Sequence, residues 1–239
     1  MNLGEIREDV YDFLQEDPQR NHSLAREVER DIHIGHMKLW GAVGKMQERY
    51  FFASSTLNEA ADNPDIALPT NLARLLVVQR IAGNGASTTA PQWMRRTRLS
   101  GDDLSGGIDA VTVRSGSSPS NYILLGNSKL RLIPTPSGSA TASIQIFYVF
   151  RPAKMQSDED EPLQPAAQEA ATGSDTLTEF HDIIGLYALE RALIKEESQQ
   201  LGAIKQLRAE RLQDLSQFIV DTDSAEPRFV PIPTAEYME

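Results

Sequence analysis

The chain has 239 residues, of which 40% are hydrophobic and 24% charged, so wholesale disorder and a fibrous repeat are both excluded. Its formal net charge of −11 argues against a protein that binds nucleic acid by neutralising many phosphates, because that mode needs a surplus of lysine and arginine. It has no cysteine, which excludes disulfides and thiolate metal sites and fits an intracellular origin. Neither a signal peptide nor a membrane-spanning helix is expected from its apolar runs.

Residues 1–82 are expected to form the N-terminal helical part of a core. Apolar residues recur at helical spacing over residues 3–14, and Pro18 limits this first helix. Ser23 can cap a second helix, in which charged residues such as Asp31 occupy the faces opposite the apolar stripe. The far end of this helix is left open by three glycines, Gly35, Gly41 and Gly44.

Two later segments of this part fit both a helix and a strand. Residues 50–56 combine aromatic and small side chains, which suits a strand or a bent helix end. Residues 72–79 carry a short helical stripe behind Thr70 or Asn71 as a capping residue, yet residues 76–78 have strand character. The pattern leaves both alternatives open.

Residues 83–155 are expected to form an antiparallel β-module, because glycine, serine, threonine and proline become frequent and the apolar runs become short. Its clearest unit is a hairpin over residues 122–134, in which Gly126-Asn127-Ser128 supplies the turn. Residues 143–150 alternate at first and then become apolar on both faces, which predicts a central strand.

The rest of the chain is expected to return to helix and to end in an arm. Residues 156–175 begin acidic, continue rich in proline and alanine, lack an apolar period and therefore predict a linker. Residues 176–220 carry the longest helical pattern, which Gly202 and the polar run 196–200 should break in two. Residues 221–239 contain three prolines with apolar residues between them and predict an extended arm. Its docking residues would be Phe229, Val230, Ile232 and Tyr237.

No catalytic residue, metal site or cofactor site is predicted. The pair His33 and His36 has a spacing that metals use, but no carboxylate stands at a ligand position nearby. His181 has no nucleophile motif beside it, and residues 83–85 lack the rest of a phosphate-binding loop. The acidic run 158–161 lacks the spacing of a calcium-binding loop and is expected to be solvated.

The densest basic and aromatic cluster contains Trp93, Arg95, Arg96 and Arg98. Such a cluster could contact a phosphate backbone or an acidic neighbouring subunit. The net charge of −11 favours the subunit contact.

The run from Tyr122 to Pro136 resembles the strand pair of tailed-phage head-to-tail connector and adaptor proteins, in which the pattern Y-x-(apolar)-x-G-x-x-(apolar)-x-(apolar)-x-P-x-P recurs. That family continues with an apolar strand, a short acidic stretch and a helix that opens with F-H. This chain has Tyr148–Met155, Asp158–Pro162 and Phe180–Ile184 in the same order. With the first helix and Leu68-Pro69, the resemblance spans most of residues 3–219, and it departs in the linker and the tail.

This resemblance implies an α+β fold in which both ends of the chain form a helical bundle around an inserted β-module. It implies a structural virion protein, made in the host cytoplasm, that forms a ring of typically twelve copies beneath the capsid portal. The ring would dock the tail or its nozzle proteins and pass DNA through its channel without binding it specifically. Helices 176–219 would form the channel wall and pack between subunits. The β-module would be the outward or tail-facing surface, and the arm 221–239 would clamp the portal.

Other functional classes fit parts of the pattern. A tail terminator or tail-completion protein would also be acidic and ring-forming, but it would be mostly β, whereas much of this chain is expected to be helical. A hydrolase with paired carboxylates has many Asp and Glu residues available, yet none lies in a motif. A host-type interaction module would bind partner helices instead of closing into a ring.

Overall fold

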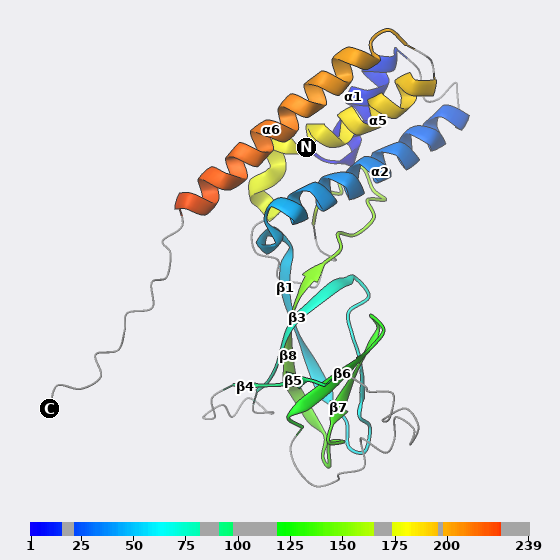
Figure 1. Ribbon diagram of the computed structural model, residues 1–239. Helices are drawn as coiled ribbons and strands as arrows, with labels where there is room; N and C mark the ends of the chain where they lie inside the picture. The colour runs from blue at the N-terminus through cyan, green and yellow to red at the C-terminus, as the bar shows by residue number, and fades with distance from the viewer. Residues whose placement is uncertain (16–21, 82–90, 98–118, 165–173, 196–197, 226–239) are drawn as a thin grey trace, which may run out of the picture.

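The computed structural model describes residues 1–15, 22–81, 91–97, 119–164, 174–195 and 198–225. Within these residues the protein is α+β, as predicted, with four α-helices and two four-stranded sheets. The helices gather at one end of the molecule and the strands at the other (Figure 1). The helices are α1 (Leu3–Leu14), α2 (His22–Met46), α5 (Asp182–Lys195) and α6 (Leu201–Ala225), with 3₁₀ turns η1 (Glu48–Phe51) and η3 (Ser174–Phe180).

The start of α1 is fixed by a reciprocal pair of hydrogen bonds. The Asn2 side chain accepts from the Glu5 backbone N–H, and the Glu5 carboxylate accepts from the Asn2 backbone N–H. This capping box satisfies two of the groups that a helix leaves unpaired in its first turn. Ile6 and Val10 are fully buried, which confirms the apolar stripe predicted for this helix.

Helix α5 lies in the middle of the helical part. It packs against α1, α2 and α6, so helices from the two ends of the chain meet there. All residues from Ile183 to Leu189 are buried, because neighbours surround this helix on several sides. The predicted break in the long helical region is confirmed: α5 ends at Lys195 and α6 begins at Leu201, although Gly202 lies inside α6.

Gly35 lets α2 approach α5 closely. A Cβ atom on Gly35 would lie 2.7 Å from the Ile184 carbonyl oxygen and 3.0 Å from the Tyr187 Cβ atom. Real Cβ atoms do not approach a backbone oxygen so closely, so only glycine fits between these two helices at this separation. The glycines of α2 therefore do not end the helix, and one of them permits its main contact.

A buried ion pair joins the same two helices. Asp31 of α2 is 2% exposed, and its Oδ1 atom accepts a hydrogen bond of 2.7 Å from the Arg191 Nε atom of α5. Lys195 Nζ lies 3.7 Å from the other carboxylate oxygen. The interpretation that grouped Asp31 with the charged residues opposite the apolar stripe is wrong, because Asp31 is buried against α5, which supplies the cations that a buried carboxylate needs.

The first sheet has the strand order β1-β8-β3-β4, from Phe52–Glu59, Ala140–Phe150, Leu72–Arg80 and Gln92–Trp93. Strand β8 lies between β1 and β3, and its residues Ile144, Ile146 and Tyr148 are fully buried. The predicted central strand is confirmed. Both segments that fitted a helix or a strand contain strands, because each pairs with β8.

The second sheet has the order β2-β7-β6-β5, from Asp65–Ala67, Lys129–Ile133, Asn121–Leu125 and Arg95–Arg96. The hairpin of β6 and β7 is confirmed, with Gly126 in the left-handed region at φ 62°. Strand β5 pairs in parallel with β6, so the prediction of a wholly antiparallel module is wrong in this detail. The chain leaves the first sheet at Trp93, the end of β4, and enters the second sheet at Arg95, the start of β5.

Two predicted boundaries differ from the structure. The strands begin at Phe52, so β1, β2 and β3 all lie within the expected N-terminal helical part. Pairing with β8 and β7 outweighs the weak helical stripe there. Helix α6 continues to Ala225, so residues 221–225 of the expected arm are helical. Side-chain bonds from Gln217 to Asp221 and from Thr222 to the Phe218 carbonyl support this last stretch.

The segment 151–164 returns from β8 to the helices and is anchored to them. Met155 is 8% exposed and Leu163 is fully buried, and the Leu163 backbone N–H donates to the His36 Nε2 atom over 2.9 Å. The prediction of an unanchored linker is therefore wrong for residues 156–164, while residues 165–173 lie outside the described part. Single buried residues and backbone hydrogen bonds hold this segment, so its sequence shows no helical or strand periodicity of apolar residues.

We predict that Gly35→Ala destabilises the protein and that Gly41→Ala does not. The new methyl group at position 35 would meet the α5 backbone, and we expect the free energy of unfolding to fall by about 1–3 kcal/mol. An added Cβ on Gly41, in the same helix, meets nothing within 4 Å. That substitution should raise the free energy of unfolding by about 0.5–1 kcal/mol. Urea denaturation of both variants measures these changes, and equal shifts would contradict the close contact at Gly35.

We predict that His36 makes the fold less stable in acid. Burial, and to a smaller extent the charges of His33 and His181, lower the pKa of His36 from 6.5 to about 4. The unfolded chain therefore takes up this proton first, so the stability is complete above about pH 6.5 and is lost as the pH falls toward 4.

The His36→Gln variant keeps a hydrogen-bond acceptor but does not titrate. As the pH falls from about 6 to about 4.5, the free energy of unfolding should decrease less steeply in this variant than in the wild type. The two slopes should differ by about 1 kcal/mol per pH unit. The same slope in both proteins would show that His36 does not carry this dependence.

Candidate interaction surfaces

Three residues of the predicted aromatic and basic cluster lie together where the chain passes between the two sheets. Trp93 is on β4, an outer strand of the first sheet, and is 65% exposed. Arg95 and Arg96 form β5, an outer strand of the second sheet, and are also exposed. Arg98 lies outside the described residues. Within the described part of the chain, neither Arg95 nor Arg96 has an ion-pair partner.

Met94 fixes the position of this cluster. Its side chain is 7% exposed and its backbone N–H donates to the Val78 carbonyl oxygen over 3.0 Å. The Arg95 backbone N–H then donates to Ser120 over 3.1 Å. Met94 and these backbone hydrogen bonds hold the segment in place. The exposed tryptophan and arginine side chains can therefore bind a partner without the free-energy cost of first ordering the backbone.

The acidic run 158–161 is tied to the first turn of α1. The Leu3 and Gly4 backbone N–H groups donate to the Asp160 and Asp158 carbonyl oxygens over 2.9 and 3.0 Å. These are first-turn donors that α1 itself cannot satisfy. An added Cβ on Gly4 would lie 3.1 Å from the Asp158 Cβ atom, so the two segments touch. The run is therefore part of the packing around α1.

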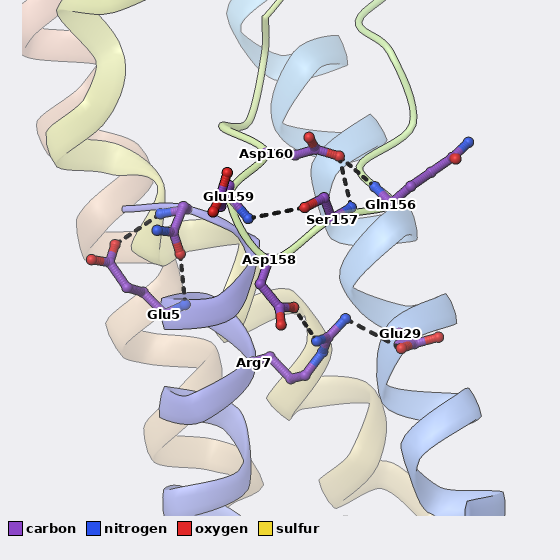
Figure 2. A network of polar contacts seen from close by, with 9 residues as sticks. Glu5, Arg7, Glu29, Gln156, Ser157, Asp158, Glu159 and Asp160 are labelled. Carbon is purple, nitrogen blue, oxygen red and sulfur yellow. Dashed lines mark hydrogen bonds and ion pairs between the residues drawn. The ribbon is translucent and has the colours of Figure 1, made fainter.

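Arg7 connects three parts of the chain at this point (Figure 2). Its guanidinium bonds the Asp158 carboxylate and, over 3.2 Å, the Glu29 carboxylate of α2. Asp160 turns the other way, and its carboxylate accepts from the backbone N–H groups of Gln156 and Ser157 over 2.6 and 2.9 Å. These two bonds hold the pKa of Asp160 below its usual value. Asp158 and Glu159 are exposed, as expected of a solvated charge run, but the bonds of Asp158 and Asp160 to the protein were not predicted.

The histidines singled out by sequence make structural contacts. The His33 and His36 rings stand 6.4 Å apart between centroids, and His36 is the one that binds the Leu163 N–H. His181 is 1% exposed, and its Nδ1 atom lies 3.0 Å from the Met1 carbonyl oxygen. Burial lowers the pKa of His181. In the part of the chain that is described, no three residues of the types that bind metals come together.

The remaining predicted sites cannot be placed. The arm residues Phe229, Val230, Ile232 and Tyr237 and the glycine loop 83–85 lie outside the described residues. Sequence reasoning also missed two side chains that join distant parts of the fold: the buried carboxylate of Asp31 and the guanidinium of Arg7. Their partners Arg191 and Asp158 are far away in the sequence, so no local spacing marks either one. No helix among the described residues is long and apolar enough to cross a membrane.

Comparison with known proteins agrees with the sequence resemblance. A family model for the SU10 adaptor protein matches residues 1–235, which include every described helix and strand. No curated protein matches the chain. Because the family match covers almost the whole chain, it confirms the expected relationship. The chain belongs to the SU10 adaptor protein family, a family of structural head-tail adaptors of phage virions.

Proposed function

We propose that copies of this chain form a closed ring, typically of twelve, between the capsid portal and the tail, where it continues the DNA channel. The match to the head-tail adaptor family over residues 1–235 carries this proposal. An adaptor has to bind proteins on both sides, and a ring is the usual way for one chain to close a passage around DNA. The tail or its nozzle proteins would be the partners below.

The charge of the chain supports a channel that does not retain DNA. With 34 acidic residues against 23 lysines and arginines, the average surface repels a polyanion. A protein that neutralised many phosphates would hold DNA with a strong salt dependence and slow its passage. An acidic ring avoids this, so DNA would pass without specific binding.

The two ends of the molecule would have different tasks in the ring. The helical bundle formed by both ends of the chain would make subunit contacts. Of the helices expected to line the channel, α5 is buried among its neighbours, so α6 would form the channel wall. The β-part would face the tail, and the arm beyond α6 would clamp the portal. The exposed cluster of Trp93, Arg95 and Arg96 would contact an acidic neighbouring subunit, because large exposed aromatic side chains are typical of binding surfaces.

The ring is tested by electron microscopy and native mass spectrometry of the purified chain, alone and mixed with the portal protein of the same phage. We expect closed rings on the portal. In the same assay Trp93→Ala should weaken assembly, whereas Trp40→Phe, inside the helical part, serves as a control for loss of a tryptophan. A folded chain that ignores the portal at every concentration would refute the proposal.

Deletion of residues 226–239 should weaken attachment to the portal without unfolding the protein. The deletion begins after α6, so the described packing stays intact. Its attachment can be compared with that of the full chain by co-sedimentation with portal particles, and circular dichroism checks the fold. Equal attachment of the two proteins would show that the arm is not the clamp.

A further inference from the structure

A cationic cavity lies between α1, α2 and the return segment 151–164. Its volume is about 420 Å³, enough for the side chains of a short protein segment. The charged groups around it are Arg7, Arg26, Arg30 and Lys154, with Glu29 as the acidic member. Acidic residues outnumber basic ones in the whole chain, so this local surplus of positive charge runs against the average.

Two of these cations have no ion-pair partner among the residues that the structure describes. Arg7 bonds Asp158 and Glu29, and the Arg30 Nε atom lies 3.5 Å from Asp31. Within the described residues, however, exposed Arg26 and Lys154 have no ion-pair partner. The charge of Lys154 also lowers the pKa of His33 at the cavity wall, after the larger effect of burial. A second, acidic chain would relieve this local excess of positive charge.

The floor of the cavity is apolar. Leu3, Ile32 and Met155 line it, and all three are buried. A phosphate of DNA would use the cations but not this floor, whereas an acidic protein surface with an apolar side chain would use both. The lining therefore favours a protein partner.

The outer face of α1 has the complementary character. Its exposed residues include Glu8, Asp9 and Asp12, and the neighbouring Phe13 is 40% exposed. Within the described residues none of these three carboxylates has a cationic partner. We refer to Glu8, Asp9, Asp12 and Phe13 as the acidic face of α1.

The cavity and the acidic face point in different directions on one molecule. Arg7 faces the cavity, and Asp12 follows five residues later, which is about 140° around a helix that turns 100° per residue. One copy therefore cannot fill its own cavity with its own acidic face. Two different surfaces that fit each other and point apart produce head-to-tail contacts, and such contacts form a ring when the rotation from one copy to the next closes.

We propose that the cavity lined by Arg26 and Lys154 receives the acidic face of α1 from a second copy of this chain. The contact rests on the ring proposed above and names the surfaces that would join its neighbouring subunits. Long-range attraction between the two surfaces would speed encounter and set the register, and it would weaken as salt is added.

Charge reversal tests this contact on the full chain. The pocket variant is Arg26→Glu with Lys154→Glu, and the face variant is Asp9→Lys with Asp12→Lys. Each alone should reduce ring assembly on the portal by about tenfold or more, because like charges then meet across the contact. A chain that carries all four substitutions should assemble again. Thermal unfolding of each variant checks that it is folded.

The matched control is Lys45→Glu with Lys205→Glu, two exposed lysines outside the cavity, which changes the net charge as much as the pocket variant. It should assemble like the wild type. Rings that form equally well in the pocket, face and control variants would overturn the contact and leave the proposed function intact. A wild-type chain that forms no ring on the portal would overturn both.

Chemical cross-linking gives an independent readout on wild-type rings. A carbodiimide joins an amine directly to a carboxylate, so it should couple Lys154 to Glu8, Asp9 or Asp12. Rings assembled from equal amounts of ¹⁴N- and ¹⁵N-labelled chains should give cross-linked peptides of mixed label, which identify a link between copies. Cross-links of Lys154 only within one copy, or only to other residues, would contradict the contact.

Discussion

The close packing of α2 on α5 is the contact on which the helical part depends. Gly35 allows the two backbones to approach, and the pair of Asp31 and Arg191 joins them beside that point. An uncompensated buried carboxylate is costly, so alignments of the two helices that separate Asp31 from Arg191 are disfavoured. Helix α5 in turn supports α1 and α6, so the position of both ends of the chain follows from this one contact.

The return segment ties the strands to this helical part. It leaves β8, passes under the start of α1 and ends at Leu163, whose backbone binds His36 of α2. The ion pair of Arg7 and Asp158 joins α1 to the return segment at the same place. The chain belongs to a phage head-tail adaptor family. This junction connects its helices to its strands through the backbone hydrogen bonds at Leu3, Gly4 and Leu163.

Local patterns predicted those elements whose sequence signal is local. The hairpin turn at Gly126 and the apolar strand from Ser143 to Phe150 were identified because their residues carry the signal themselves. Strand β3 was ambiguous because its helical stripe and its strand character are both weak, and only pairing with β8 decides between them. The sequence identified Trp93, Arg95 and Arg96 as a surface cluster, but the cationic cavity combines residues from three separate segments and leaves no local pattern.

The passage from β4 to β5 has a mechanical consequence. A single residue, Met94, separates the two strands, so this is the shortest link between the sheets in the described chain. Trp93 is fastened to one sheet and Arg95 to the other, and a slide of one sheet past the other would pull these side chains apart. A partner that binds both side chains at once would therefore stabilise the relative position of the two sheets. Its affinity would in turn depend on how the sheets are aligned.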